Sequence, residues 1–263
     1  MPKYFDTHSH VHFKQYDEDR DEVLDRMREK NVWTIAVGTS FETSKSAVAL
    51  AGSERDVVRG ATIGIHPTDT NEHFNDFTWE LDSQVVGVGE CGLDFYRGSR
   101  EALYSKQKEN FEAQIDFAVK HDLPLMLHIR PSQGTEDAHI DALEILKSFQ
   151  KMYGEKVRGN THFFTGSAKI AKQYIDIGFT IAFPGVITFA KETQEAVKEV
   201  PLGMILSETD SPYASPVPYR GQRNEPSYVA EVVHKIAEIK NMDTEEVQKT
   251  LVQNGMRVFG IKA

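Results

Sequence analysis

The sequence has little of what disulfide-bonded, membrane-spanning or secreted proteins need. It contains a single cysteine, Cys91, so no disulfide can form within the chain, and a reducing compartment is expected. No apolar run approaches the roughly 18 residues that cross a membrane. The N-terminal residues, which begin with Met1 and Pro2, lack the apolar core of a signal peptide. We therefore expect a cytoplasmic protein without a membrane partner.

Positive charge is also scarce. The 263 residues include 30 lysines and arginines against 40 aspartates and glutamates, which gives a formal net charge of −10. A protein that holds nucleic acid on a broad basic face usually has the opposite balance. Any contact with nucleic acid must therefore be local or carried by bound cations.

What the chain does contain is an alternation of strand-like and helix-like segments. Apolar, β-branched runs recur eight times, and amphipathic or capped helical segments separate them. Alternating β and α units predict a parallel sheet, and eight units in this length predict a single-domain (β/α)₈ TIM barrel over residues 1–263. An open doubly wound sheet is the alternative, although no Gly-rich phosphate loop opens the first helix. The expected strands cover residues 4–10, 32–38, 57–66, 85–90, 124–129, 157–164, 179–183 and 202–207.

The stretch Asp6-Thr-His-Ser-His10 gives the first indication of chemistry. Residues two apart on a strand point to the same side, so His8 and His10 would direct two imidazoles at one point, with Asp6 below them. Neutral imidazole is a common metal ligand. These two histidines would supply half of a metal site.

Further ligand types follow the later strands. The carboxyl ends of the strands of a barrel converge on one mouth, where active sites lie. Side chains far apart in the sequence would therefore face one small volume. These side chains are His66, Glu90, His128, His162 and Asp210.

Apart from His66, four imidazoles and two carboxylates offer mixed nitrogen and oxygen ligation for Zn²⁺, Mn²⁺ or Mg²⁺. Six ligands are more than one four-coordinate ion needs, and we expect one to three ions. Paired ions about 4 Å apart clamp the attacking and leaving oxygens of a displacement and lower the pKa of bound water to about 7. Glu90, on a central strand, is the candidate bridge. Asp210 is the candidate for binding an ion and for orienting or deprotonating the attacking water.

Motifs along the whole chain resemble those of the TatD-type metal-dependent deoxyribonucleases, within the wider amidohydrolase-like barrels. The resemblance implies metal ligands at His8, His10, Glu90, His128, His162 and Asp210. It also implies hydrolysis of DNA phosphodiester bonds, often of exonuclease character. The motifs that carry it are Asp6-Thr-His-Ser-His10, Gly64-Ile-His-Pro67, Gly87-Val-Gly-Glu-Cys-Gly-Leu-Asp94, Leu127-His-Ile-Arg130, Thr161-His-Phe-Phe-Thr-Gly166, Glu208-Thr-Asp-Ser-Pro212 and Arg223-Asn-Glu-Pro226.

The chain departs from the family pattern in places that bear on substrate preference. Val11-His12 stands where the family usually has Leu-Asp, and Arg130 precedes Pro131 where an acidic residue is common.

No lysine lies near Glu90 to serve as a carbamylated bridge. This absence favours the nuclease-like branch over phosphotriesterase-like or dihydroorotase-like barrels.

Three residues outside the ligand set are candidates for substrate binding. His66 is either a ligand or a hydrogen-bonding residue, whose partner would be a substrate phosphate or a side chain that supports the ligands. Arg130 and Arg223 could bind phosphate, with an ion pair to a nearby carboxylate as the alternative for Arg130. The Pro-rich loop over residues 212–221 contains Tyr213 and Tyr219, which could stack on bases or form a purely structural lid.

The sequence thus predicts a metal-dependent deoxyribonuclease in which activated water attacks phosphorus. The acidic chain suggests a DNA end or single strand at the mouth, and we expect a monomer without an obligate protein partner. One alternative is an amidohydrolase or esterase acting on a small molecule, and another is a D-aminoacyl-tRNA deacylase. A non-enzymatic barrel is disfavoured because the set of ligand types is complete.

Overall fold

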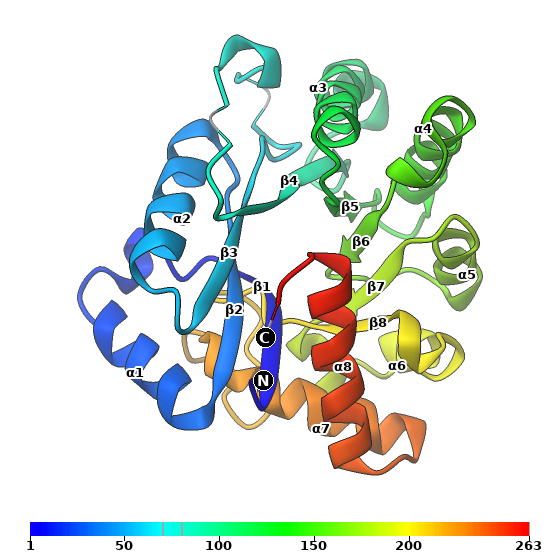
Figure 1. Ribbon diagram of the computed structural model, residues 1–263. Helices are drawn as coiled ribbons and strands as arrows, with labels where there is room; N and C mark the ends of the chain where they lie inside the picture. Colours follow the sequence, from blue (N-terminus) through cyan, green and yellow to red (C-terminus); the bar gives the residue numbers. More distant parts are fainter. Residues whose placement is uncertain (70, 80, 263) are drawn as a thin grey trace.

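The computed structural model describes residues 1–69, 71–79 and 81–262. Within these residues, eight parallel strands pair in chain order, and helices surround them (Figure 1). The predicted (β/α)₈ barrel is confirmed, and the order of the strands excludes a doubly wound sheet. The strands are β1 (Tyr4–Ser9), β2 (Val32–Val37), β3 (Val58–Ile63), β4 (Val85–Asp94), β5 (Leu125–Arg130), β6 (Gly159–His162), β7 (Thr180–Phe183) and β8 (Ile205–Ser207).

Polar caps begin several of the helices. Ser40, Ser99, Ser167 and Asp243 each accept a hydrogen bond from main-chain N–H groups of the first turn, which intrahelical bonds cannot satisfy. No described helix combines the length and apolar character that a membrane crossing requires. The helices are α1 (Arg20–Lys30), α2 (Phe41–Ser53), α3 (Arg100–His121), α4 (Asp137–Tyr153), α5 (Ala168–Asp176), α6 (Lys191–Glu199), α7 (Val229–Lys240) and α8 (Thr244–Val258).

Alternation along the strands builds two apolar layers. One cluster fills the barrel interior with buried side chains such as Phe5, Val37 and Met126, and Phe259 after α8 closes its lower end. A larger cluster packs the outward-facing side chains against the helices. Cys91 belongs to this outer cluster, so its thiol packs away from the mouth. Apolar side chains therefore fill the interior below the carboxyl ends of the strands, and the candidate ligands lie above them at the mouth.

Side chains join the first strand to the last. Between β1 and β8, Thr7 Oγ1 donates to the carbonyl of Ser207, and Ser207 Oγ donates to the carbonyl of Phe5. Main-chain N–H groups of His10 and Asp210 donate across the same seam to the carbonyls of Ser211 and His8. The seam thus holds the segment after β8 against the histidines of β1.

Several strand boundaries differ from the sequence prediction, including those of β4 and β8. β4 continues to Asp94, because residues 91–94 pair in parallel with residues 127–130 of β5. β8 begins at Ile205, since Leu202–Met204 forms a 3₁₀ turn. The longer β4 brings Asp94 to the mouth of the barrel.

Candidate metal centre

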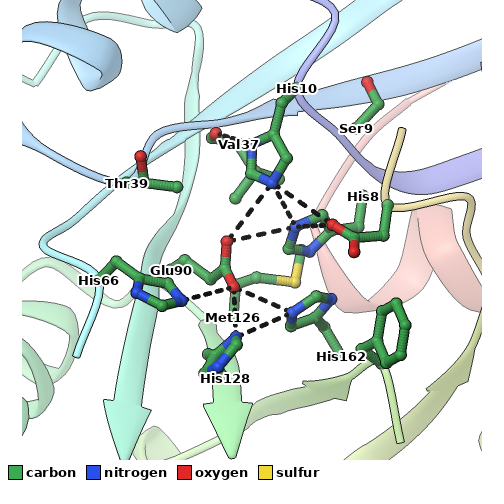
Figure 2. A network of polar contacts seen from close by, with 12 residues as sticks. His8, Ser9, His10, Val37, Thr39, His66, Glu90, Met126, His128 and His162 are labelled. Carbon is green, nitrogen blue, oxygen red and sulfur yellow. Dashed lines mark hydrogen bonds and ion pairs between the residues drawn. The ribbon is translucent and has the colours of Figure 1, made fainter. Parts of the chain in front are cut away.

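A first group of ligand atoms gathers where β1 meets the segment after β8. The Nε2 atoms of His8 and His10 lie 3.3 Å apart. Asp210 Oδ1 lies 3.7 Å from the Nε2 of His8 and 3.5 Å from that of His10. Both nitrogens are also 3.5 Å from Glu90 Oε2. We call His8, His10 and Asp210 the first group (Figure 2).

A second group surrounds the other oxygen of Glu90. Glu90 Oε1 lies 2.7 Å from His128 Nδ1, 3.0 Å from His162 Nε2 and 3.5 Å from His66 Nε2. We call these three histidines the second group. Figure 2 shows Glu90 between the two groups, with each oxygen directed at a different one. The side chain of Glu90 is buried, with 3% exposed, so these side chains are its main polar partners.

The first group has the chemistry of a cation site. His10 Nδ1 lies 2.7 Å from the carbonyl of Val37 and donates to it, so the neutral ring presents an Nε2 lone pair to Glu90 and Asp210. A lone pair and two carboxylate oxygens at these distances repel one another unless a positive charge lies among them. A divalent ion would supply that charge, and the main-chain partner of His10 fixes the ring in the way that ligand histidines are commonly fixed.

His66 is arranged differently. Its Nδ1 accepts a hydrogen bond from the main-chain N–H of Thr68 at 3.2 Å, so Nε2 carries the proton of the neutral ring. This nitrogen faces Glu90 Oε1 as a donor. The tautomer favours the hydrogen-bonding role for His66 over direct ligation.

Two acidic side chains support the histidines of the second group. Asp94 Oδ2 lies 3.0 Å from His128 Nε2, where it orients the imidazole. Glu208 Oε1 lies 3.4 Å from His162 Nδ1 and accepts from the main-chain N–H of Phe163 at 2.6 Å. Glu208 is fully buried, and its Oε2 has no partner among the described residues.

Sequence reasoning missed Glu208 as a site residue. Its only signal was its position two residues before Asp210, because side chains two apart in an extended segment share a face. The strand ends at Ser207, so this periodicity was a weak guide.

The electrostatics of the two groups follow from burial and close charges. Burial alone would raise the pKa of Glu90, but His162 and His66 hold it well below its ordinary value. Burial lowers the pKa of His8 and of His66. Burial would also lower the pKa of His162, yet the carboxylates of Glu90 and Glu208 raise it well above the ordinary value. These shifts favour the ionised form of Glu90 and the protonated form of His162, so a cation bound at His162 would have to displace a proton.

The two candidate arginines lie in different surroundings. Arg130 ends β5 at the mouth, and its guanidinium carbon lies 3.9 Å from the ring centroid of Tyr96. No carboxylate among the described residues lies within ion-pair distance of Arg130. Arg223 instead forms a bidentate pair with Asp19 and donates to the carbonyl of Gln15. Its role in binding phosphate stays a prediction.

The Pro-rich loop over residues 212–221 is partly bound to the scaffold. Tyr219 stacks on Tyr228 at 3.8 Å between ring centroids, and Arg220 lies 3.8 Å from the ring of Phe189. Tyr213 is 49% exposed and lies 6.3 Å from His10, ring to ring. Of the two tyrosines expected in this loop, Tyr213 is therefore the one beside the first group.

Known proteins resemble this chain over nearly its full length. A metal-dependent hydrolase of Bacillus subtilis, YabD, is 39% identical over 264 residues that cover 98% of this chain and 99% of the relative. The metal-dependent hydrolase YcfH of Escherichia coli is 32% identical and covers 98% of this chain and 96% of its own length. Both relatives are named as uncharacterised.

Solved structures and a family model agree with these relatives. The crystal structure of YjjV, a TatD homologue of Escherichia coli, has a TM-score of 0.86 at 26% identity and covers 99% of each chain. The TatD family protein of Entamoeba histolytica shares the fold, with a TM-score of 0.79 at 22% identity and 97% of each chain covered. The family model described as TatD related DNase matches residues 5–260. The chain therefore belongs to the TatD family and is a metal-dependent hydrolase.

Proposed function

We propose that this chain hydrolyses phosphodiester bonds of DNA, at ends or in single strands, with divalent ions shared through Glu90. The observation that carries the proposal is the placement of the Glu90 carboxylate, whose two oxygens face two separate sets of imidazoles. Two ions about 4 Å apart are the arrangement suited to displacement at phosphorus. The TatD related DNase family model adds support for DNA as the substrate.

The residues of the chain would take distinct roles in this reaction. When bound, Zn²⁺, Mn²⁺ or Mg²⁺ would supply Lewis-acid activation of water and of phosphate oxygens. His8, His10 and Asp210 would hold one ion and His128 and His162 the other, with Glu90 contributing to both. Asp210, the more accessible of the two carboxylates, would orient the attacking water and accept its proton.

Donors around the second group would bind the phosphate. The protonated Nε2 of His66 points toward Glu90 and would donate to a phosphate oxygen placed there. Arg130 would stabilise the charge that develops on the phosphate in the transition state. Arg223 could contribute only by leaving its pair with Asp19.

The charge of the chain bears on the form of DNA that would bind. Because the chain has a net charge of −10, we expect its surface to offer a long duplex little electrostatic attraction. We expect a monomeric cytoplasmic enzyme that binds DNA locally, with an affinity that falls as salt rises. A processive, salt-insensitive grip on long duplex DNA would contradict this proposal.

A substrate panel tests the proposal. Labelled single-stranded DNA, blunt duplex DNA, RNA, mischarged tRNA and a set of small esters and amides are incubated with each ion and with EDTA. Cleavage of DNA that needs the ion is the expected result, with loss below pH about 6 because the ligand histidines must be neutral. Turnover confined to D-aminoacyl-tRNA or to small esters and amides would instead assign one of the alternative hydrolase activities.

A further inference from the structure

Tyr96 and Arg130 form an exposed pair, of which the proposed hydrolysis gives a role to Arg130 alone. Arg130 covers one face of the Tyr96 ring at 3.9 Å, yet the tyrosine is still 48% exposed, so part of the ring stays accessible. Among the described residues, no carboxylate pairs with Arg130, whereas Arg100 and Arg158 each bind an aspartate. A flat aromatic surface and a guanidinium with free donors therefore lie together at the protein surface.

This pair lies directly above the second group. Met126, His128 and Arg130 alternate on one face of β5, and Met126 belongs to the cluster inside the barrel. Arg130 is thus one step further toward solvent than the ligand candidate His128. Asp94 and Arg130 are paired residues in the β4–β5 ladder. The segment with Tyr96, which follows Asp94, therefore begins at the level of Arg130.

Asp94 connects the pair to the candidate ligand His128. Its Oδ2 contacts His128 Nε2 at 3.0 Å, and its Oδ1 accepts from the main-chain N–H of Tyr96 at 2.9 Å. Gln107 fixes the main chain of Asp94 with two hydrogen bonds of 2.9 Å each. One buried carboxylate therefore anchors the main chain of Tyr96 beside His128, and the contact with Arg130 holds the ring.

We propose that Tyr96 and Arg130 form a subsite for an unpaired nucleotide next to the scissile phosphodiester, and this inference rests on the proposed function. Arg130 donates to a backbone phosphate, and the accessible surface of Tyr96 stacks on the base. Bases inside a duplex are covered on both faces by their neighbours. The subsite therefore selects single strands and frayed ends, and it takes any base because stacking needs only a π-face.

Binding of a cleavage-resistant oligonucleotide tests the subsite. A short fluorescein-labelled phosphorothioate DNA strand is titrated into the full-length protein with divalent ion, and again with EDTA, and anisotropy gives the Kd. We expect Tyr96→Ala to raise the Kd about tenfold, while Tyr96→Phe stays near the original value. Arg130→Gln should raise the Kd and reduce the slope of log K against log salt by about 0.7, the value for one phosphate contact on a single strand.

An abasic strand separates stacking from other effects of the tyrosine. If the ring stacks on a base, removing the bases lowers the affinity of the unmodified protein, and Tyr96→Ala then adds little further loss. Arg130→Gln should weaken binding of both strands equally. Tyr153→Ala and Arg158→Gln are matched controls, because they alter an exposed tyrosine and a partly exposed arginine at the opposite end of the barrel.

The outcomes distinguish this inference from the proposed function. If the unmodified protein cleaves DNA but Tyr96→Ala binds both strands as well as the controls do, the subsite is wrong and the nuclease proposal stands. An equal loss for Tyr96→Ala on the normal and the abasic strand would also overturn base stacking. If the unmodified protein neither binds nor cleaves DNA, both proposals fail together.

Discussion

Glu90 lies between two groups of imidazoles, and its oxygens are not equivalent. Oε2 contacts the first group at 3.5 Å, while Oε1 contacts His128 and His162 of the second group at 2.7 and 3.0 Å. Because the side chain is buried, bulk solvent does not screen either contact. At the scale of single residues, this one carboxylate links the two halves of the centre.

Exchanging carboxylates for amides should therefore have unequal effects. Glu90→Gln places an N–H₂ group toward one of the two groups and removes the shared charge, so we expect binding of both ions to weaken. Asp210→Asn changes only the first group, and we expect it to weaken one ion. Isothermal titration with Mn²⁺ and metal analysis of the dialysed protein measure the number of ions bound.

Turnover should fall by at least about a hundredfold in both variants, since each weakens ion binding and Asp210→Asn also removes the proton acceptor. Circular dichroism must show that each variant remains folded. Glu231→Gln, on the outer helix α7, is a control for the loss of a carboxylate. Full activity in either site variant would refute the roles assigned to these residues.

At the scale of elements, the seam between β1 and β8 depends on a buried side chain. Asp6 accepts from the main-chain N–H groups of His8 and Thr209 and from the Thr209 hydroxyl, at 3.2, 2.8 and 2.6 Å. Burial raises the pKa of Asp6 well above its ordinary value, although the bonds from Thr209 act in the opposite direction. Through these contacts, Asp6 positions the segment that carries Asp210.

Removal of this acceptor should weaken the seam. Asp6→Ala leaves three buried donors without a partner, and we expect the free energy of unfolding to fall by about 3 kcal/mol or more. Asp6→Asn retains an oxygen for the two N–H groups and should lose less. Urea unfolding measures both, with the exposed Asp116→Ala as a control. If Asp6→Ala had the same free energy of unfolding as the original protein, water would be replacing the Asp6 carboxylate.

A second prediction at this scale concerns the packing of α4 on α5. His139 on α4 is buried, with its Nδ1 3.2 Å from the Tyr174 hydroxyl, and burial lowers its pKa to about 4. An unfolded histidine has a pKa of about 6.5, so between these values the unfolded chain binds more protons than the folded one. The free energy of unfolding should therefore fall as the pH drops through this range.

From pH 7 to pH 5, we expect this group to remove about 2 kcal/mol of stability. His139→Gln keeps a hydrogen-bonding group near Tyr174 but cannot titrate, so its loss over the same range should be smaller by that amount. Urea unfolding in EDTA measures the difference, and His121→Gln on α3 is the control. Parallel pH profiles for the original protein and His139→Gln would contradict the prediction.

At the scale of the whole molecule, the barrel brings together ligand candidates from β1, β4, β5, β6 and the segment after β8 (Figures 1 and 2). These residues are up to 202 positions apart, between His8 and Asp210. They meet only when the barrel is closed, so an unfolded chain offers no such site. Ion binding is consequently linked to folding of the entire barrel.

Divalent ions should therefore stabilise the entire domain. At a free concentration about 100 times the Kd, one ion adds about 2.7 kcal/mol to the free energy of unfolding. For a protein of this size, we expect Tm to rise by about 5–10 °C relative to EDTA. Differential scanning calorimetry measures the shift, which should be smaller for Asp210→Asn. An unchanged Tm with Zn²⁺, Mn²⁺ and Mg²⁺ would argue against a cation site.

The sequence alone determined the barrel and predicted most of the side chains that gather at its mouth. Eight alternating units require parallel strands, and parallel strands place residues such as His128 and His162 at one end because every strand points the same way. Spacing by two on β1 also predicted that His8 and His10 act together. These features follow from local periodicity, which the order of residues states directly.

Only the tertiary structure decided which candidate ligands lie next to each oxygen of Glu90. The sequence predicted a bridge, but the distances of its two oxygens depend on the stagger of neighbouring strands and on rotamers. The same reason explains why Glu208 was missed beside His162, and why Arg223 was not expected to pair with Asp19. Contacts between residues far apart in the chain depend on how packed elements meet in space, and no periodicity along the chain encodes those distances.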